Sequence, residues 1–157
     1  MRILVMSDSH SDEYSVRRAI EEQKNEASVL VHLGDGERDV DLSAPLLSGM
    51  KVVQVKGNCD FGSLLNANEI IDVAGKRIFC THGYLEQVKY GESILEEKAS
   101  QYNADIILYG HTHKAVTSFR NGVYYFNPGS IREGMYGFID ITPSGIMCVH
   151  RDMYERP

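Results

Sequence analysis

Tyr109-Gly110-His111-Thr112-His113 places two imidazole side chains one residue apart in a turn that contains glycine. The turn follows residues 104–108, an Ala-Asp-Ile-Ile-Leu run that we interpret as a buried strand. Such a strand presents two nitrogen donors at its carboxyl end, and imidazole is a common ligand of transition metals. Two loop histidines that bind nothing are the alternative, so the other strand ends must decide between the two readings.

Four other apolar runs also end in side chains that bind metals. They are residues 2–7 with Asp8 and His10, residues 27–33 with Asp35, residues 51–55 with Asn58, and residues 76–80 with His82. Sites in α/β proteins gather at the carboxyl ends of strands, so we expect these side chains to meet His111 and His113. Without metal such a cluster would be electrostatically costly. Two divalent cations that share a bridging carboxylate would remove that cost.

The pattern of strands and helices changes along the chain. The first half alternates strands with helices, one beginning after a Ser11 N-cap, a short one over 39–48 and another over 92–102. The second half is typical of hairpins, and Asn121-Gly122 is the strongest turn signal. The expected hairpins pair 69–73 with 76–80, 115–119 with 123–126, and 137–141 with 146–149. We predict an α/β fold, a four-layer αββα sandwich of two mixed β-sheets flanked by helices, as one domain over 1–157 with a loose tail over 151–157.

Composition excludes several classes of function. The net charge of −6 and pI near 5.5 argue against binding to long nucleic acid, which needs clustered Lys and Arg. No apolar run approaches the roughly 20 residues that span a membrane, and the N-terminal run is too short for a signal peptide. Three widely spaced cysteines without a CxxC motif indicate free thiols in a reducing compartment. We therefore expect a cytoplasmic protein with no membrane partner.

The five motifs, taken in order, resemble a known signature. Asp8-x-His10, Gly34-Asp35, Gly57-Asn58, His82-Gly83 and Gly110-His111-x-His113 are similar to the five-part pattern of the calcineurin-like metallophosphoesterases, over essentially the whole chain. The chain is most similar to the small single-domain phosphodiesterase branch, which also resembles the retromer scaffold subunit. The resemblance implies one metal held by Asp8, His10, Asp35 and His113. It implies a second metal held by Asp35, Asn58, His82 and His111, with Asp35 as the bridge.

This resemblance implies a dinuclear metal-dependent phosphoesterase, most simply a phosphodiesterase of small phosphoesters. Two dications would lower the pKa of a bridging water, and the resulting hydroxide would attack phosphorus in line. Mn²⁺ is the first expectation, with Zn, Fe, Ni or Co compatible with these ligands. Asn58, Asp60 and His82 are assigned to catalysis, Asn58 offering its amide hydrogens to substrate and Asp60 orienting a ligand. The alternative is a non-catalytic metal-binding scaffold of the same fold.

Cys59 departs from the family pattern, in which histidine commonly follows the asparagine and protonates the leaving oxygen. A thiol with a pKa near 8.5 is a poor substitute for imidazolium at neutral pH. Cys59 is a neutral filler, an extra thiolate ligand or a redox-sensitive brake, and we favour the filler. We therefore expect cleavage of esters whose leaving groups depart unprotonated, such as activated aryl esters.

The remaining polar residues leave alternatives open. We interpret His32 as a core residue that supports a ligand, and Glu37, Asp39 and Asp41 as a solvated face. The Asn127-Pro128-Gly129-Ser130 segment either lines the cleft or is a plain turn. Four tyrosines, Tyr84, Tyr90, Tyr124 and Tyr125, either form a contact surface, as in a homo-oligomer, or pack within strands.

Two other hydrolase classes fit less well. Haloacid-dehalogenase phosphatases need a second aspartate two residues after the position of Asp8, where this chain has His10. Zinc β-lactamase-type hydrolases need His-x-His-x-Asp-His, but His113 is followed by Lys114-Ala115-Val116, so Ala115 and Val116 stand where Asp and His are needed.

Overall fold

The computed structural model describes residues 1–155, which form two mixed β-sheets. The first sheet has the order β10-β9-β1-β2-β3 and the second the order β4-β5-β6-β8-β7. The strands are β1 Arg2–Met6, β2 Ala27–His32, β3 Lys51–Gln54, β4 Asn68–Val73, β5 Lys76–Thr81, β6 Ile106–Leu108, β7 Ala115–Arg120, β8 Val123–Pro128, β9 Met135–Thr142 and β10 Gly145–Asp152. The helices are α1 Glu13–Gln23, α2 Glu37–Leu42 and α3 Ser93–Tyr102, with short 3-10 turns η1 Ala44–Leu46 and η2 Ile131–Glu133.

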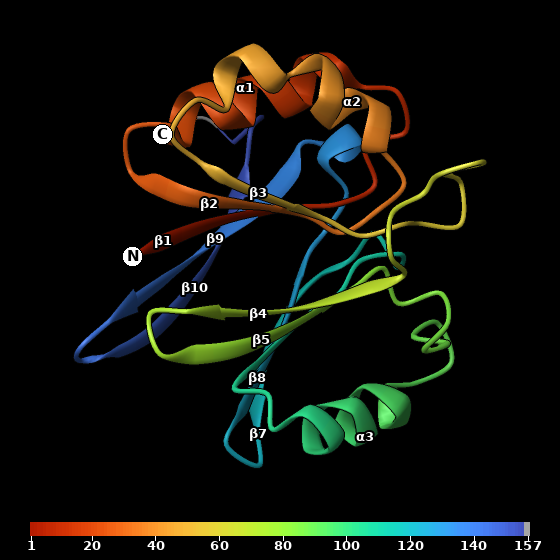
Figure 1. Ribbon diagram of the computed structural model, residues 1–157, viewed down its shortest axis with the longest axis vertical. Coiled ribbons are helices and arrows are strands. Elements are labelled where there is room, and N and C mark those ends of the chain that lie inside the picture. The colour runs from red at the N-terminus through yellow and green to blue at the C-terminus, as the bar shows by residue number, and fades with distance from the viewer. Residues whose placement is uncertain (156–157) are drawn as a thin grey trace.

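Each sheet contains three adjacent parallel strands. In the first sheet β1, β2 and β3 are parallel, β9 is antiparallel to β1, and β10 is antiparallel to β9. In the second sheet β5, β6 and β8 run together, and β4 and β7 are antiparallel edge strands. The carboxyl ends of the parallel strands therefore lie at the same end of the two sheets, where long loops emerge (Figure 1). This arrangement confirms the two mixed sheets expected from the sequence.

Side chains along each strand point alternately to the two faces of its sheet, and this alternation separates the core between the sheets from the outer helical layers. Ile3 and Val5 of β1 point toward the second sheet and meet Ile78 and Ile106 in the core between the sheets. Leu4 and Met6 point the other way, onto α1. The helices therefore lie on the outer faces, α1 and α2 on the first sheet and α3 on the second (Figure 1).

Three local expectations were wrong. The N-cap of α1 is Asp12, whose Oδ1 accepts from Ser15 N at 3.1 Å, because Ser11 has a left-handed φ of 70°. The short helix over 39–48 divides into α2 and η1, and Pro45 lies at the start of η1. The tail expected from residue 151 continues β10 to Asp152, and Met153 is buried beneath α1; residues 156–157 lie outside the described chain.

Candidate metal centre

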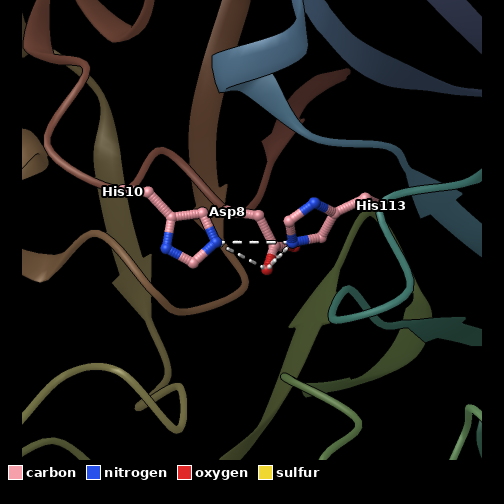
Figure 2. A group of neighbouring side chains, drawn as sticks. All are labelled: Asp8, His10 and His113. Carbon is pink, nitrogen blue, oxygen red and sulfur yellow. Dashed lines mark hydrogen bonds and ion pairs between the residues drawn. The ribbon is translucent and has the colours of Figure 1, made fainter.

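The seven predicted ligands come together at the carboxyl ends of five strands. Asp8 and His10 follow β1, Asp35 follows β2, Asn58 follows β3, His82 follows β5, and His111 and His113 follow β6. One group forms around Asp8, whose Oδ1 lies 3.1 Å from His113 Nε2 and 3.7 Å from His10 Nε2. Figure 2 shows the two imidazole rings converging on this carboxylate from opposite sides.

A second group forms around His82. Its Nε2 lies 3.0 Å from Asn58 Oδ1, 3.2 Å from His111 Nδ1 and 3.4 Å from Asp35 Oδ2. The same Asp35 oxygen lies 3.9 Å from His10 Nε2 in the first group. Asp35 therefore faces both groups of donors.

These donors fit divalent cations. Asp8 Oδ1 is buried and has no hydrogen-bond partner among residues 1–155, although buried carboxylate oxygens are almost always paired. Its neighbours are imidazole nitrogens, and nitrogens of different rings approach to 3.3 Å between His10 and His113. Oxygen and nitrogen lone pairs that converge in this way form a ligand set for a metal such as Zn or Mn.

Hydrogen bonds orient the ligand nitrogens. His82 Nδ1 lies 2.7 Å from the carbonyl oxygen of Leu33, so that Nδ1–H donates and Nε2 keeps a free lone pair. His113 Nδ1 faces Glu133 Oε1 at 3.4 Å, which likewise turns Nε2 toward Asp8. In each ring, the nitrogen directed into the site is the one free to bind metal.

The electrostatics favour a charged Asp35 and a neutral His111. Burial acts to raise the pKa of Asp35, but contacts with His82 and a 2.6 Å hydrogen bond from Cys59 N hold that pKa well below its usual range. Burial and the neighbouring His82 lower the pKa of His111. Burial alone would lower the pKa of His82, yet Asp35 and Asp8 raise it overall. Ionised carboxylates and neutral imidazoles are the forms that bind metals.

Five of the ligands lie on strained backbone, which the sequence did not reveal. Their φ angles are positive, at 57° for Asp8, 45° for His10, 58° for Asp35, 66° for His111 and 60° for His113. A left-handed φ is uncommon outside glycine and recurs at functional sites. Hydrogen bonds between the loops hold it, among them His10 N to Asp35 O at 2.9 Å and His111 N to Asp8 Oδ2 at 3.1 Å.

Two glycines allow the ligand loops to approach one another. The turn after β6 is tight, since Thr112 N donates to Gly110 O at 2.8 Å, and the residue with a left-handed φ in this turn is His111. Glycine at position 110 is required for space, because a Cβ there would lie 2.0 Å from Ser7 Oγ. A Cβ on Gly57 would lie 2.1 Å from Asp35 Oδ1.

Asp60 contacts the backbone of two ligand loops. Its carboxylate accepts from the N–H groups of Asp35 at 2.8 Å, Gly36 at 2.9 Å, Glu37 at 3.2 Å and Gly57 at 2.8 Å. One side chain thus ties the loop after β2 to the loop after β3.

Sequence reasoning missed Asp39. The expectation that it belongs to a solvated face is wrong, because only 4% of Asp39 is exposed and its Oδ2 accepts from Ser9 Oγ and Ser11 N. Ser9 also lies 3.4 Å from Nε2 of the fully buried His32, whose Nδ1 accepts from Gly34 N. These residues fix the loop that carries His10, and no motif in the sequence marks Asp39.

The segment at Asn127 supports the paired histidines from behind. Asn127 Nδ2 donates to Gly110 O at 2.9 Å and to Thr112 Oγ1 at 3.0 Å. Ser130 Oγ donates to Asp8 O at 2.9 Å. Asn127 and Ser130 are fully buried, so the segment is neither a plain turn nor an exposed cleft wall.

Comparison with known proteins agrees with this geometry. Residues 1–141 match the model of the calcineurin-like phosphoesterase superfamily domain. The chain belongs to this family. It is 33% identical over 132 residues to a probable metallophosphoesterase, YsnB, of Bacillus subtilis, covering 84% of this chain and 76% of that protein. It is 30% identical over 105 residues to the phosphodiesterase YfcE of Escherichia coli, covering 57% of this chain and 53% of YfcE.

The fold also matches solved structures. Wild-type Vps29 of Entamoeba histolytica, complexed with zinc, superposes with a TM-score of 0.73 at 23% identity and covers 98% of this chain and 99% of its own. This likeness shows the shared fold. Within residues 1–155, no helix has the length and apolar character needed to cross a membrane.

Proposed function

We propose that this calcineurin-like chain is a dinuclear metal-dependent phosphodiesterase that acts on small phosphoesters. The observation that carries the proposal is Asp35, which faces both donor groups while Asp8 Oδ1 lies buried and unpaired beside them. One ion would be held by Asp8, His10, Asp35 and His113, and the other by Asp35, Asn58, His82 and His111.

When bound, two dications would neutralise phosphate charge and lower the pKa of a water for in-line attack on phosphorus. Asn58 has its Oδ1 directed at His82, and its Nδ2 donates to Cys59 Sγ at 3.3 Å, so we assign the second hydrogen of this NH₂ group to a substrate oxygen. Asp60 is a positioning residue in this scheme, because it contacts only the backbone of the loops that carry Asp35 and Asn58. Mn²⁺ remains our first expectation for the metal.

The leaving group must depart without help from Cys59. Burial and the nearby Asp35 raise the pKa of this thiol, so it is neutral and a weak acid at neutral pH. The chain therefore suits esters with stable leaving groups. Its three cysteines are free thiols, which agrees with a reducing compartment, and we place the protein in the cytoplasm.

A diester suits this site better than a monoester. Beside His10 lies a hollow of about 470 Å³ whose charged lining residues are five acids, Asp35, Glu37, Asp39, Asp41 and Asp60, and one base, Arg38, so that the lining is acidic on balance. A phosphodiester carries one negative charge and a monoester up to two, so the acidic wall penalises the monoester more. The similarity to the phosphodiesterase YfcE supports the same choice.

A metal-binding interaction scaffold is the second candidate. The likeness to Vps29 and the exposed Phe61 and Tyr90, which line hollows at the site, favour it. Catalysis is the better-supported reading because a scaffold has no need for seven convergent ligands.

Metal analysis combined with hydrolysis of bis(p-nitrophenyl) phosphate separates the two functions. We expect two ions per chain and turnover with added Mn²⁺, which Asp8→Ala and His82→Ala should abolish. Glu97→Ala, an exposed acid on α3, is the matched control and should change neither quantity. Stoichiometric metal without turnover of any phosphoester in a panel would assign the chain to the scaffold class.

A further inference from the structure

The two sides of the metal centre differ in the surface that surrounds them. The hollow beside His10 is acidic, whereas the hollow beside His111 is lined by Tyr84, Leu85 and Tyr90 together with Lys89. This second hollow has a volume of about 630 Å³ and includes Asn58 and His111 at one end. Its size is that of a site for a small molecule, and it opens directly onto two of the candidate ligands.

The loop that carries these aromatic residues is anchored from below. Val88 is buried, and the buried carboxylate of Glu86 accepts from Thr81 Oγ1 at 2.8 Å. Tyr90 N donates to Gln87 O at 2.9 Å. The loop thus holds its buried side fixed while 55% of Tyr84 and 91% of Tyr90 remain exposed. Exposed aromatic rings on a fixed loop bind planar ligands with little loss of conformational entropy.

Tyr84 connects this surface to the metal centre. Its ring meets the His111 imidazole edge to face, with centroids 5.5 Å apart and planes inclined at 80°. A phosphoryl group at the metal centre would therefore lie beside Tyr84, and a substituent on that group could reach Tyr90. Lys89, in the same hollow, adds a positive charge where the opposite side of the site has carboxylates.

We propose that Tyr84, Leu85 and Tyr90 form a subsite for a planar aromatic substituent of the phosphoester. The substrate class is thus an aryl or nucleoside phosphodiester, and this inference rests on the proposed function. Stacking on aromatic side chains accepts any planar ring, so an aryl group and a nucleobase share the required chemistry. A second copy of the chain or a protein partner is the competing occupant, but neither accounts for the opening of this hollow onto Asn58 and His111.

Binding of non-hydrolysable phosphonates to the Mn²⁺-loaded protein tests the subsite. Phenylphosphonate and methylphosphonate share the same anionic group and differ in the ring. We expect calorimetry to show about tenfold tighter binding of phenylphosphonate, since stacking of one ring is worth roughly this factor. A second comparison, of adenosine monophosphate with ribose 5-phosphate, tests a nucleobase in the same way. Tighter binding of the ring-bearing ligand in only one of the two comparisons identifies which ring the subsite accepts.

Variants of Tyr84 and Tyr90 test whether their loop causes the preference for phenylphosphonate over methylphosphonate. Tyr90→Ala and Tyr84→Leu should bring the phenyl-to-methyl affinity ratio close to one, while Tyr90→Phe and Tyr84→Phe retain it. Methylphosphonate affinity should stay constant throughout, which shows that His111 and the metal centre are undisturbed. Phe119→Ala, an exposed aromatic of β7 that does not line the hollow, should keep the full ratio.

The outcomes separate the subsite from the proposed function. Affinity ratios near one in both the phenyl and the nucleobase comparisons of the native chain, or a preference that survives both Tyr90→Ala and Tyr84→Leu, would overturn the subsite even if bis(p-nitrophenyl) phosphate is hydrolysed. Selective phosphonate binding without hydrolysis of any ester would instead contradict the phosphodiesterase and leave the aromatic-anion site standing. A ratio near one, together with self-association that Tyr90→Ala abolishes, would assign the surface to a second copy of the chain.

Discussion

The two sheets contribute different chemistry to the candidate metal centre. The loops of the first sheet supply every oxygen ligand, from Asp8, Asp35 and Asn58, and one imidazole, from His10. The loops of the second sheet supply imidazoles alone, from His82, His111 and His113.

The two sets of loops are also held differently. Carboxylates fix the first-sheet loops, the buried Asp39 beside His10 and the partly buried Asp60 beside Asp35. In the second sheet, His82 is oriented by a contact to the first sheet, from its Nδ1 to Leu33 O. Neither sheet contains a site by itself. Loss of Asp35 should therefore disturb both groups of ligands, and loss of a ligand that belongs to one group should disturb mainly that group.

Asp35→Asn should have the largest effect, because this carboxylate faces both donor groups. We expect loss of both ions by elemental analysis and a fall in kcat/KM for bis(p-nitrophenyl) phosphate of at least about 100-fold. The amide keeps the shape and an acceptor for Cys59 N, so the fold should persist by circular dichroism. Retention of one tightly held ion would show that Asp35 is not shared.

His111→Ala and His113→Ala should each remove mainly one ion, and a different one. His113 belongs with Asp8 and His10, whereas His111 belongs with His82 and Asn58. Elemental analysis after dialysis should find about one ion per chain in both variants, and a spectroscopic probe such as Co²⁺ should give two distinct spectra. Identical spectra would contradict the division into two groups.

Asp60→Asn tests the support of the first-sheet loops without removing a ligand. Each carboxylate oxygen accepts from two of the four backbone N–H groups, so the amide keeps two of these hydrogen bonds and opposes the other two donors with its own NH₂. We expect a loss of about 1–3 kcal/mol in the free energy of unfolding and roughly 10- to 100-fold in metal affinity. Asp41→Asn, an exposed acid on α2, is the control and should leave both unchanged.

Cys59→His bears on how leaving groups depart. An imidazolium at this position can protonate the leaving oxygen, so alkyl diesters should gain more than activated aryl diesters. We expect the aryl-to-alkyl ratio of kcat/KM to fall by about tenfold or more. An unchanged ratio would show that proton donation at residue 59 does not limit the reaction.

His32→Gln should alter how the stability of the fold depends on pH. Burial lowers the pKa of His32 from 6.5 to about 4, so the unfolded chain takes up a proton at a higher pH than the folded chain does. The folded state therefore loses up to about 3 kcal/mol as the pH falls from 6.5 to 4, and the loss is complete below 4. Urea titrations of wild type and His32→Gln should diverge in this window, with the variant less sensitive to pH. Parallel curves would contradict a neutral buried His32, and His150→Gln, which is only partly buried, is the control.

The convergence of the seven candidate ligands could be predicted from the sequence because each lies in the loop that follows an apolar run, and parallel strands bring such loops to one end of a sheet. The hairpin at Asn121-Gly122 could also be predicted, since both residues readily adopt the left-handed φ that this turn requires and both have it in the structure.

The support of the site could be predicted only in part. Asp60 follows the Gly57-Asn58 motif and was expected to orient a ligand, whereas Asp39 acts through contacts with a loop distant in sequence, and an acidic residue in a helix has the same local pattern when it is solvated. The left-handed φ of His111 depends on its bond to Asp8 and on Asn127 behind the turn, which only the packed fold brings together.

Gly57 and Gly110 supply no ligand, yet each leaves room that a single methyl group would fill. A relative could therefore keep all seven ligand residues and still lack the metal centre, if either glycine had been replaced. Catalytic competence in this family is for that reason better judged from the ligands together with these two glycines than from the ligands alone. A substitution at either glycine could therefore abolish metal binding in the course of evolution while every ligand residue is retained.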